Sequence, residues 1–152
     1  MKRKILIFGI VVIAIMLSGC GSRNPIDAEK FQRIMEMNGY IITDATYQLD
    51  SDEVTLLLIA AGDGDYQFEF NELVSASSAQ RYFSAFQSFL ESGKGSSHVT
   101  SSVSGTNFSS YNLTTNGRYY HLLRVENTVI AADADAAYRD YIREMFRRLD
   151  EE

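Results

Sequence analysis

The sequence predicts a single α+β domain, an antiparallel sheet of about six to seven strands with two to three helices packed on it. Three observations support this fold class. Segments whose apolar residues recur every three or four positions are interspersed with short runs that are alternating or wholly apolar. The links between successive expected strands are short, which favours antiparallel neighbours. The expected order is one helix, three strands, a second helix, four strands and a final helix.

The first expected helix begins after Asp27, a residue type that caps helix N-termini. Ile26 and Phe31 flank this position at the spacing of a hydrophobic staple, in which two apolar side chains pack across the first turn. Asn38 and Gly39 then provide the residues that commonly end a helix.

Three strands are expected next, separated by polar turns rich in Asp and Gly. The second of them is apolar at every position except Thr55, which predicts a central strand buried on both faces. The third alternates aromatic and polar residues, which predicts a strand buried on one face. The expected ranges are 40–49, 54–61 and 66–73.

The second helix is expected to begin near Ser75 or Ser77 and to end at Gly93. Its apolar residues fall on one helical stripe, so we expect it to be the main packing element of the core. The stripe consists of Ala79, Tyr82, Phe83, Phe86, Phe89 and Leu90.

Residues 96–115 are dense in Ser and Thr, a composition found in disordered segments and also in strands. We favour strands, because aromatic residues are interspersed and Gly105 and Asn116-Gly117 supply turns at regular spacing. Strands are also expected at 119–125 and 128–132. Asp133 or Asp135 then caps a final helix. Its expected apolar positions are Tyr138, Tyr141, Ile142, Met145 and Leu149.

The N-terminus has the three-part pattern of a secretory signal. Three basic residues precede an apolar run at 5–17, which is about thirteen residues long, whereas a membrane-spanning helix needs roughly 20. A permanent transmembrane anchor is therefore the less favoured alternative. The four residues after the core of this run are Leu17, Ser18, Gly19 and Cys20, and they resemble the lipobox of bacterial lipoproteins.

This resemblance implies that Cys20 receives diacylglycerol and that the chain is cleaved between Gly19 and Cys20. Two acyl chains are enough for stable membrane attachment. Residues 1–19 would then be the signal peptide, 20–26 the lipidated cysteine with a tether reaching roughly 20 Å when extended, and 27–152 the domain. Because Cys20 is the only cysteine, no intramolecular disulfide is available.

The organisation of the domain is similar, by analogy only, to cystatin-like and PsbP/Mog1-like folds. The whole chain resembles small uncharacterised lipoproteins of Gram-positive bacteria, in its lipobox and in stretches such as 66–73 and 78–86. That resemblance implies a location on the outer face of the cell membrane. Without the three basic signal residues, eleven basic residues face twenty acidic ones, a net charge of −9. This balance argues against nucleic acid as a partner.

Chemical motifs are sparse. His98 and His121 are too few for a zinc site and are expected on the surface of the sheet. Acidic turns resemble calcium loops but lack the remaining ligands, so we interpret their residues as turn formers. The segment 93–97 lacks the spacing of a phosphate-binding loop. The acidic turn residues are Asp50, Asp52, Glu53, Asp63 and Asp65. The sequence thus predicts no metal, no cofactor and no enzymatic activity, although a catalytic triad assembled from distant positions stays an alternative.

Two candidate interaction surfaces remain. Arginines at 139, 143 and 147, with Arg148 beside them, form a ridge on the last helix that could hold an anionic headgroup, a wall polymer or an acidic partner. We favour the alternative, a solvated face paired internally through Asp135 and Glu144. Core packing is the first explanation for the aromatic residues, but tyrosines on the Ser/Thr-rich strands could instead offer a surface for a peptide or glycan. The candidate residues are Arg139, Arg143, Arg147, Arg148, Tyr111, Tyr119 and Tyr120.

We therefore expect a membrane-anchored binding module that holds an envelope protein partner. The alternative is a carrier or sensor with an apolar ligand pocket between the sheet and the second helix.

Overall fold

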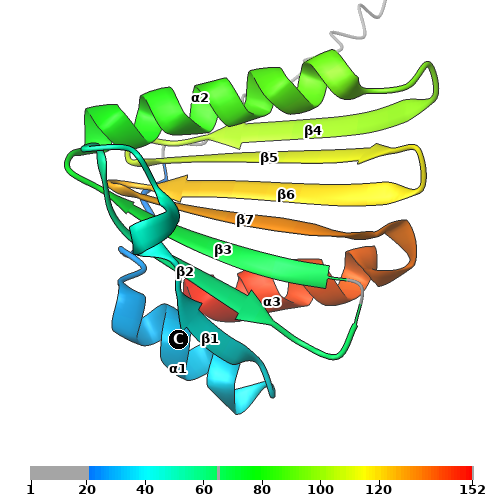
Figure 1. The fold of residues 1–152 in the computed structure, drawn as a ribbon. Helices are drawn as coiled ribbons and strands as arrows, with labels where there is room; N and C mark the ends of the chain where they lie inside the picture. The colour runs from blue at the N-terminus through cyan, green and yellow to red at the C-terminus, as the bar shows by residue number, and fades with distance from the viewer. Residues whose placement is uncertain (1–20, 65, 152) are drawn as a thin grey trace, which may run out of the picture.

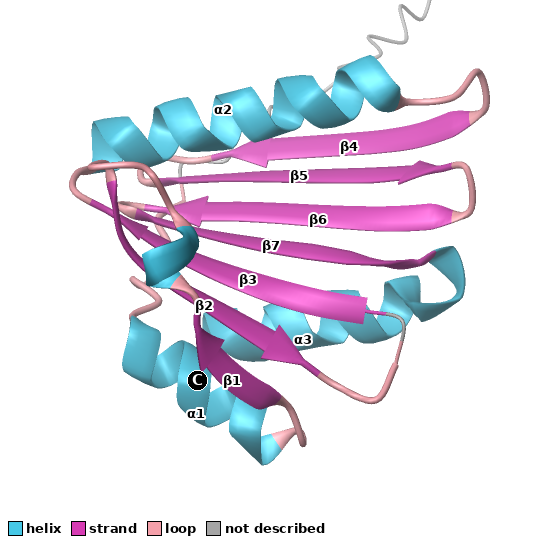
Figure 2. Ribbon diagram, in the orientation of Figure 1, coloured by secondary structure: helices cyan, strands magenta, loops and turns pink. Residues whose placement is uncertain are grey.

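The computed structural model describes residues 21–64 and 66–151, and Cys20 and the signal segment lie outside them. The described residues form one seven-stranded antiparallel sheet with three α-helices on its two faces (Figures 1 and 2). The predicted α+β class and the predicted order of helices and strands are confirmed.

The elements follow the chain in the order expected. They are α1 (Ala28–Met37), β1 (Ile41–Asp44), a short 3-10 helix (Thr46–Gln48), β2 (Val54–Ala61), β3 (Tyr66–Leu73), α2 (Ala76–Gly93), β4 (His98–Ser104), β5 (Phe108–Thr115), β6 (Arg118–Val125), β7 (Thr128–Asp135), a second 3-10 helix (Ala136–Tyr138) and α3 (Arg139–Glu151).

The strand order across the sheet is β1-β2-β3-β7-β6-β5-β4. Consecutive strands pair within β1 to β3 and within β4 to β7, α2 connects β3 to β4, and β7 pairs with β3. In this pairing Phe70 lies opposite Ile130, so the two halves of the chain share one continuous core. β2 is buried on both faces at Leu57 and Leu58, as expected, but it lies next to the edge strand β1 and is not central.

The larger apolar cluster lies on the face covered by α1 and α3. Phe31 and Ile34 of α1 and Ile142 and Phe146 of α3 are buried there against aromatic residues of β3 such as Phe68. The larger cluster thus lies beneath α1 and α3 and not beneath α2, so the prediction that α2 is the main packing element of the core is wrong.

The smaller cluster lies beneath α2. Phe83 and Leu90 are buried, whereas Phe89 of the predicted stripe is 70% exposed. A helix buries only the width of surface that meets the sheet, and this stripe is wider than that. Tyr111 and Leu122 complete the cluster from β5 and β6.

Side-chain caps fix the helix starts. Asp27 accepts a hydrogen bond from the Lys30 amide, and Ser75 accepts one from the Ser78 amide, so Ser75 and not Ser77 caps α2. Asp135 accepts from the Ala137 amide and begins the last helical segment.

The strand expected at 40–49 is shorter than predicted. Asp44 ends β1 because its carboxylate accepts hydrogen bonds from the Thr46 amide and hydroxyl, at 2.9 and 2.6 Å. These bonds also lower the pKa of Asp44. An Asp side chain that binds the backbone two residues ahead favours a turn over a strand.

The Ser/Thr-rich stretch forms β4 and β5, which confirms strands there. Asn116 and Gly117 both adopt positive φ, at 50° and 76°, the two-residue hairpin geometry that favours this residue pair. β4 is an edge strand whose residues are all exposed.

The expected tether is packed onto the domain. Asn107 in the β4–β5 turn accepts a hydrogen bond from the Arg23 amide and donates one to the Arg23 carbonyl, both at 2.9 Å. The Arg23 guanidinium lies 4.4 Å from the centre of the Phe108 ring, and the Thr106 amide donates to the Gly21 carbonyl. The chain therefore enters the domain at the end of the sheet that carries the β4–β5 turn. Within the described residues, no helix is both long and apolar enough to span a bilayer.

Candidate functional site

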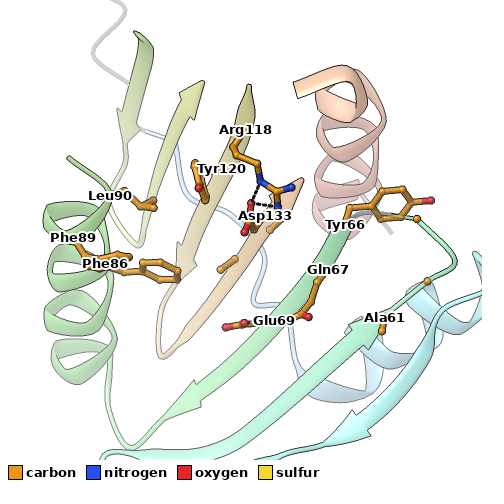
Figure 3. Close-up of a pocket in the computed structure, with 14 residues that line it drawn as sticks. Ala61, Tyr66, Gln67, Glu69, Phe86, Phe89, Leu90, Arg118, Tyr120 and Asp133 are labelled. Atoms are coloured by element: carbon orange, nitrogen blue, oxygen red, sulfur yellow. Dashed lines mark hydrogen bonds and ion pairs between the residues drawn. The ribbon is translucent and has the colours of Figure 1, made fainter. Parts of the chain in front are cut away.

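An open groove of about 640 Å³ lies between α2 and the sheet (Figure 3). It is found at the end of the sheet opposite the packed N-terminal segment. Its lining residues come from β2, β3, β6, β7, α2 and the β2–β3 turn, and are Ala61, Gly62, Gly64, Tyr66, Gln67, Glu69, Phe86, Phe89, Leu90, Arg118, Tyr120, Ala131, Ala132 and Asp133.

The groove exists because α2 covers only part of its face of the sheet. The helix packs over β6 and β7, and the outer strands on this face lack a second helix (Figure 2). Small side chains at Ala61 and Ala131 keep the floor low. Phe86 and Phe89 form an aromatic wall on α2, and the Phe89 side chain is largely exposed to solvent.

The floor of the groove carries charge. Arg118 Nε donates to Asp133 Oδ1 at 3.0 Å, and this hydrogen bond raises the pKa of Arg118. Beside this pair, Gln67 donates to Glu69 Oε1 at 3.0 Å. Burial raises the pKa of the Tyr82 hydroxyl, and the negative charge of Glu69 raises it further. The floor thus holds two carboxylates and one guanidinium next to an apolar wall.

A group of tyrosines lies beside the groove near the β2–β3 turn, on the face of the sheet that carries α1 and α3, and only Tyr66 of this group also lines the groove. The Tyr66 ring lies 4.9 Å from the Tyr138 ring and 5.3 Å from the Tyr141 ring, measured between centroids. Tyr40 donates to the Tyr141 hydroxyl at 3.0 Å. A Cβ atom at Gly64 would collide with the Tyr66 ring, so this glycine leaves room for the aromatic side chain. Sequence spacing does not reveal this group, because its members are far apart in the chain.

The predicted arginine ridge is mostly neutralised by its own helix. Arg147 pairs with Glu144 and Glu151, and Arg148 pairs with Glu144 at 3.3 Å. Hydrogen bonds from Arg147, and then from Arg148, hold the pKa of Glu144 at about 2. Arg139 pairs with the neighbouring Asp140 at 3.3 Å and not with Asp135, which serves as a cap. Arg143 alone of the four has no ion pair among the described residues.

The three candidate tyrosines do not form one surface. Tyr111 is buried beneath α2, where its hydroxyl donates to Glu91. Tyr119 is buried on the opposite face, with its hydroxyl donating to Asn112 at 2.7 Å. Only Tyr120 reaches the groove. Neighbours at 119 and 120 point to opposite faces because successive strand residues alternate.

The expectation that both histidines lie on the surface is wrong for His121. Its ring is buried and stacks on Phe146, with centroids 3.7 Å apart. Burial, together with the positive charges of Arg23 and Arg143, lowers the pKa of His121 to about 3. His98 is exposed on β4, and its Nδ1 lies 2.9 Å from the Gly95 carbonyl oxygen.

One of the acidic turn residues makes an ion pair with a helix. Glu53 pairs with Arg81 of α2. Asp63 lies in the turn beside Gly64, and Asp65 lies outside the described residues. Residues 93–97 form the end of α2 and its link to β4. In residues 21–64 and 66–151, no three His, Cys, Asp or Glu side chains are grouped as metal ligands.

No family model and no curated protein sequence matches the chain. Among solved structures, the chain is similar to a GTP-binding regulator from Thermotoga maritima, with 12% identity, a TM-score of 0.52, and coverage of 85% of this chain and 93% of that one. It also aligns with the extracellular domain of PknH from Mycobacterium tuberculosis, at 10% identity and a TM-score of 0.39, covering 83% of this chain and 92% of the other. The first likeness shows a shared fold.

Proposed function

We propose that this protein is a lipid-anchored lipoprotein of the bacterial envelope whose domain is a non-catalytic binding module, and that the groove beside α2 receives a segment of a protein partner. The observation that carries the proposal is the 70% exposure of Phe89 on the wall of a groove of about 640 Å³. Exposed aromatic side chains at a concave surface are typical of contact sites that dominate binding energy.

The composition of the groove supports a protein partner. Phe86 and Phe89 offer apolar contact, and the charged floor around Asp133 offers polar contact at the same place (Figure 3). Protein interfaces combine an aromatic centre with a polar surround in this way. With two carboxylates against one guanidinium, the floor fits a segment that carries an apolar anchor and a basic side chain.

The test is photo-crosslinking in intact cells from a photoreactive residue at position 67, on the floor of the groove. We expect a discrete crosslinked partner, and we expect Phe89→Ser to reduce its yield by about tenfold, as the loss of a binding hot spot does. Because Phe89 is exposed, this substitution removes little packing from the folded domain.

Tyr47→Ser is the matched control, because Tyr47 is 80% exposed and lies outside the groove. It should leave the crosslink unchanged. Equal crosslinking in the Phe89→Ser and Tyr47→Ser proteins would show that the groove is not the binding site.

A small-ligand carrier is the second candidate, because the groove volume falls within the range of about 300–1,000 Å³ found for ligand pockets. In that case a low-molecular-mass compound should be recovered by solvent extraction of the purified full-length protein. Its amount should approach one per chain and should fall in the Phe89→Ser variant. A carrier would give this result without the crosslinked protein.

A further inference from the structure

A second concave site lies on the other face of the sheet, where α3 meets β4 and β5. Strand register builds it from cross-strand rows. His121 of β6 lies opposite Asn112 of β5, which lies opposite Ser101 of the edge strand β4. The adjacent row contains Tyr119 and Thr114. α3 covers the inner end of these rows and leaves the outer end as a cleft of about 150 Å³.

Hydrogen bonds within the rows leave hydroxyl protons available. Asn112 Nδ2 donates to Ser101 Oγ at 3.2 Å, so the Ser101 hydroxyl is free to donate its own proton elsewhere. The Thr114 hydroxyl makes no hydrogen bond to any described residue. Asn112 Oδ1 is already occupied by the Tyr119 hydroxyl at 2.7 Å. The polar floor of the cleft therefore presents donors more than acceptors.

Positive charge comes from α3. Arg139 and Arg143 line the cleft from above. Arg139 is partly neutralised by Asp140, whereas no ion pair joins Arg143 to a carboxylate anywhere in residues 21–64 and 66–151. Burial raises the pKa of the Tyr119 hydroxyl to about 12, while the positive charges of Arg143 and Arg139 lower it and the negative charge of Asp140 raises it.

We propose that this cleft binds a phosphate group carried on a small alcohol such as glycerol, with Arg143 as the principal contact and the Ser101 and Thr114 hydroxyls as further donors. The donors that line the cleft come from three elements, α3, β4 and β5. A phosphate monoester has three non-bridging oxygens and a phosphodiester has two, in both cases around a tetrahedral phosphorus, whereas the two oxygens of a carboxylate lie in one plane with its carbon. A guanidinium group is well suited to bind two phosphate oxygens at once.

The same chemistry can come from a soluble glycerol phosphate or from the headgroup of an anionic lipid. The cleft volume of about 150 Å³ limits the bound part to a headgroup-sized moiety. This site is separate from the groove beside α2, so either site can fail its test without affecting the other.

The test is NMR titration of the full-length protein in neutral detergent micelles, following the Nε–Hε signal of Arg143. The probes are inorganic phosphate, sn-glycerol 3-phosphate, and phosphatidylglycerol added to the micelles. We expect saturable shifts at Arg143 with glycerol phosphate, with phosphatidylglycerol or with both, and the responding probe identifies the source. Titration with sodium chloride to the same ionic strength should not reproduce the shifts.

Arg143→Gln should weaken binding by at least about tenfold, since it removes a charge-assisted hydrogen bond. Thr114→Val keeps the side-chain shape and should weaken binding severalfold. Arg147→Gln is the matched control, because Arg147 is on the same helix but is engaged by two glutamates. If no probe gives saturable shifts, or if Arg143→Gln and Arg147→Gln weaken binding equally, the proposal is wrong.

Discussion

At the scale of single residues, burial gives His121 a role in stability that the sequence does not reveal. The ring stacks on Phe146, and Nε2 lies 3.3 Å from the Ser110 hydroxyl. Tyr119 donates its proton to Asn112, so it can only accept from Nδ1–H of His121, at 3.5 Å. This arrangement suits the neutral imidazole with its proton on Nδ1.

We predict that His121 makes the domain less stable as the pH falls. Its folded pKa of about 3 lies below the unfolded value of 6.5, so only the unfolded chain binds a proton between these values. The contribution of His121 to the free energy of unfolding is complete above about pH 6.5. Below that pH it decreases by up to about 1.4 kcal/mol per pH unit. Urea unfolding at pH 6.5, 5.5 and 4.5 measures this slope.

His121→Gln cannot titrate and should flatten the dependence between pH 6.5 and 4.5, although it should also lower stability at all pH values. Glu144, with a pKa held low by Arg147, acts mainly below this window. His98→Gln, on the exposed edge strand, should keep the wild-type slope. An unchanged slope in His121→Gln would exclude this histidine as the cause.

At the scale of elements, the N-terminal segment is held by the β4–β5 turn. We predict that Asn107→Ala releases it, because the substitution removes two hydrogen bonds to Arg23, each contributing about 1 kcal/mol. Hydrogen exchange of the Arg23 amide should accelerate at least tenfold. Asn127→Ala is the control, since Asn127 bonds to Leu73 in the neighbouring turn. Equal acceleration in both variants would contradict a specific contact.

Helix and strand positions could be predicted because their signals are local. The cap at Asp27, the alternation after Tyr66 and the turn at Asn116-Gly117 each need only a few neighbouring residues. Errors arose where a side chain competes with the backbone. Asp44 ends β1 early through its bonds to Thr46, although the sequence there remains compatible with a strand.

The candidate sites could be predicted only in part. Arg143 was among the expected residues. That Arg147 is paired and Arg143 is not, among the described residues, depends on which arginines contact Glu144 in the folded helix. The groove depends on how much of the sheet α2 covers, and no spacing in the sequence encodes that. Phe89 is the one local indication of the groove. It lies beyond the width of surface that a helix buries, and it is exposed.

At the scale of the whole molecule, the proposed lipid on Cys20 sets the location of the domain. We predict that Cys20→Ser moves the protein from the membrane fraction to the soluble or unprocessed fraction, because two acyl chains supply the stable attachment. Cell fractionation with mass spectrometry of the N-terminal peptide measures this change. The domain should keep its unfolding midpoint, since the substitution changes none of the residues that form the described domain. An unmodified Cys20 in the mature membrane-bound protein would contradict the proposal.

The packed segment from Gly21 to Ile26 determines how far the groove lies from the point of lipid attachment. With those residues bound to the β4–β5 turn, the extended tether of roughly 20 Å is lost, and the lipid attaches almost directly to one end of the sheet. The groove lies toward the other end, about seven residues along β6, from Val125 to Arg118, which corresponds to roughly 20 Å. In the proposed anchored form, the groove therefore lies at the end of the sheet away from the point of lipid attachment.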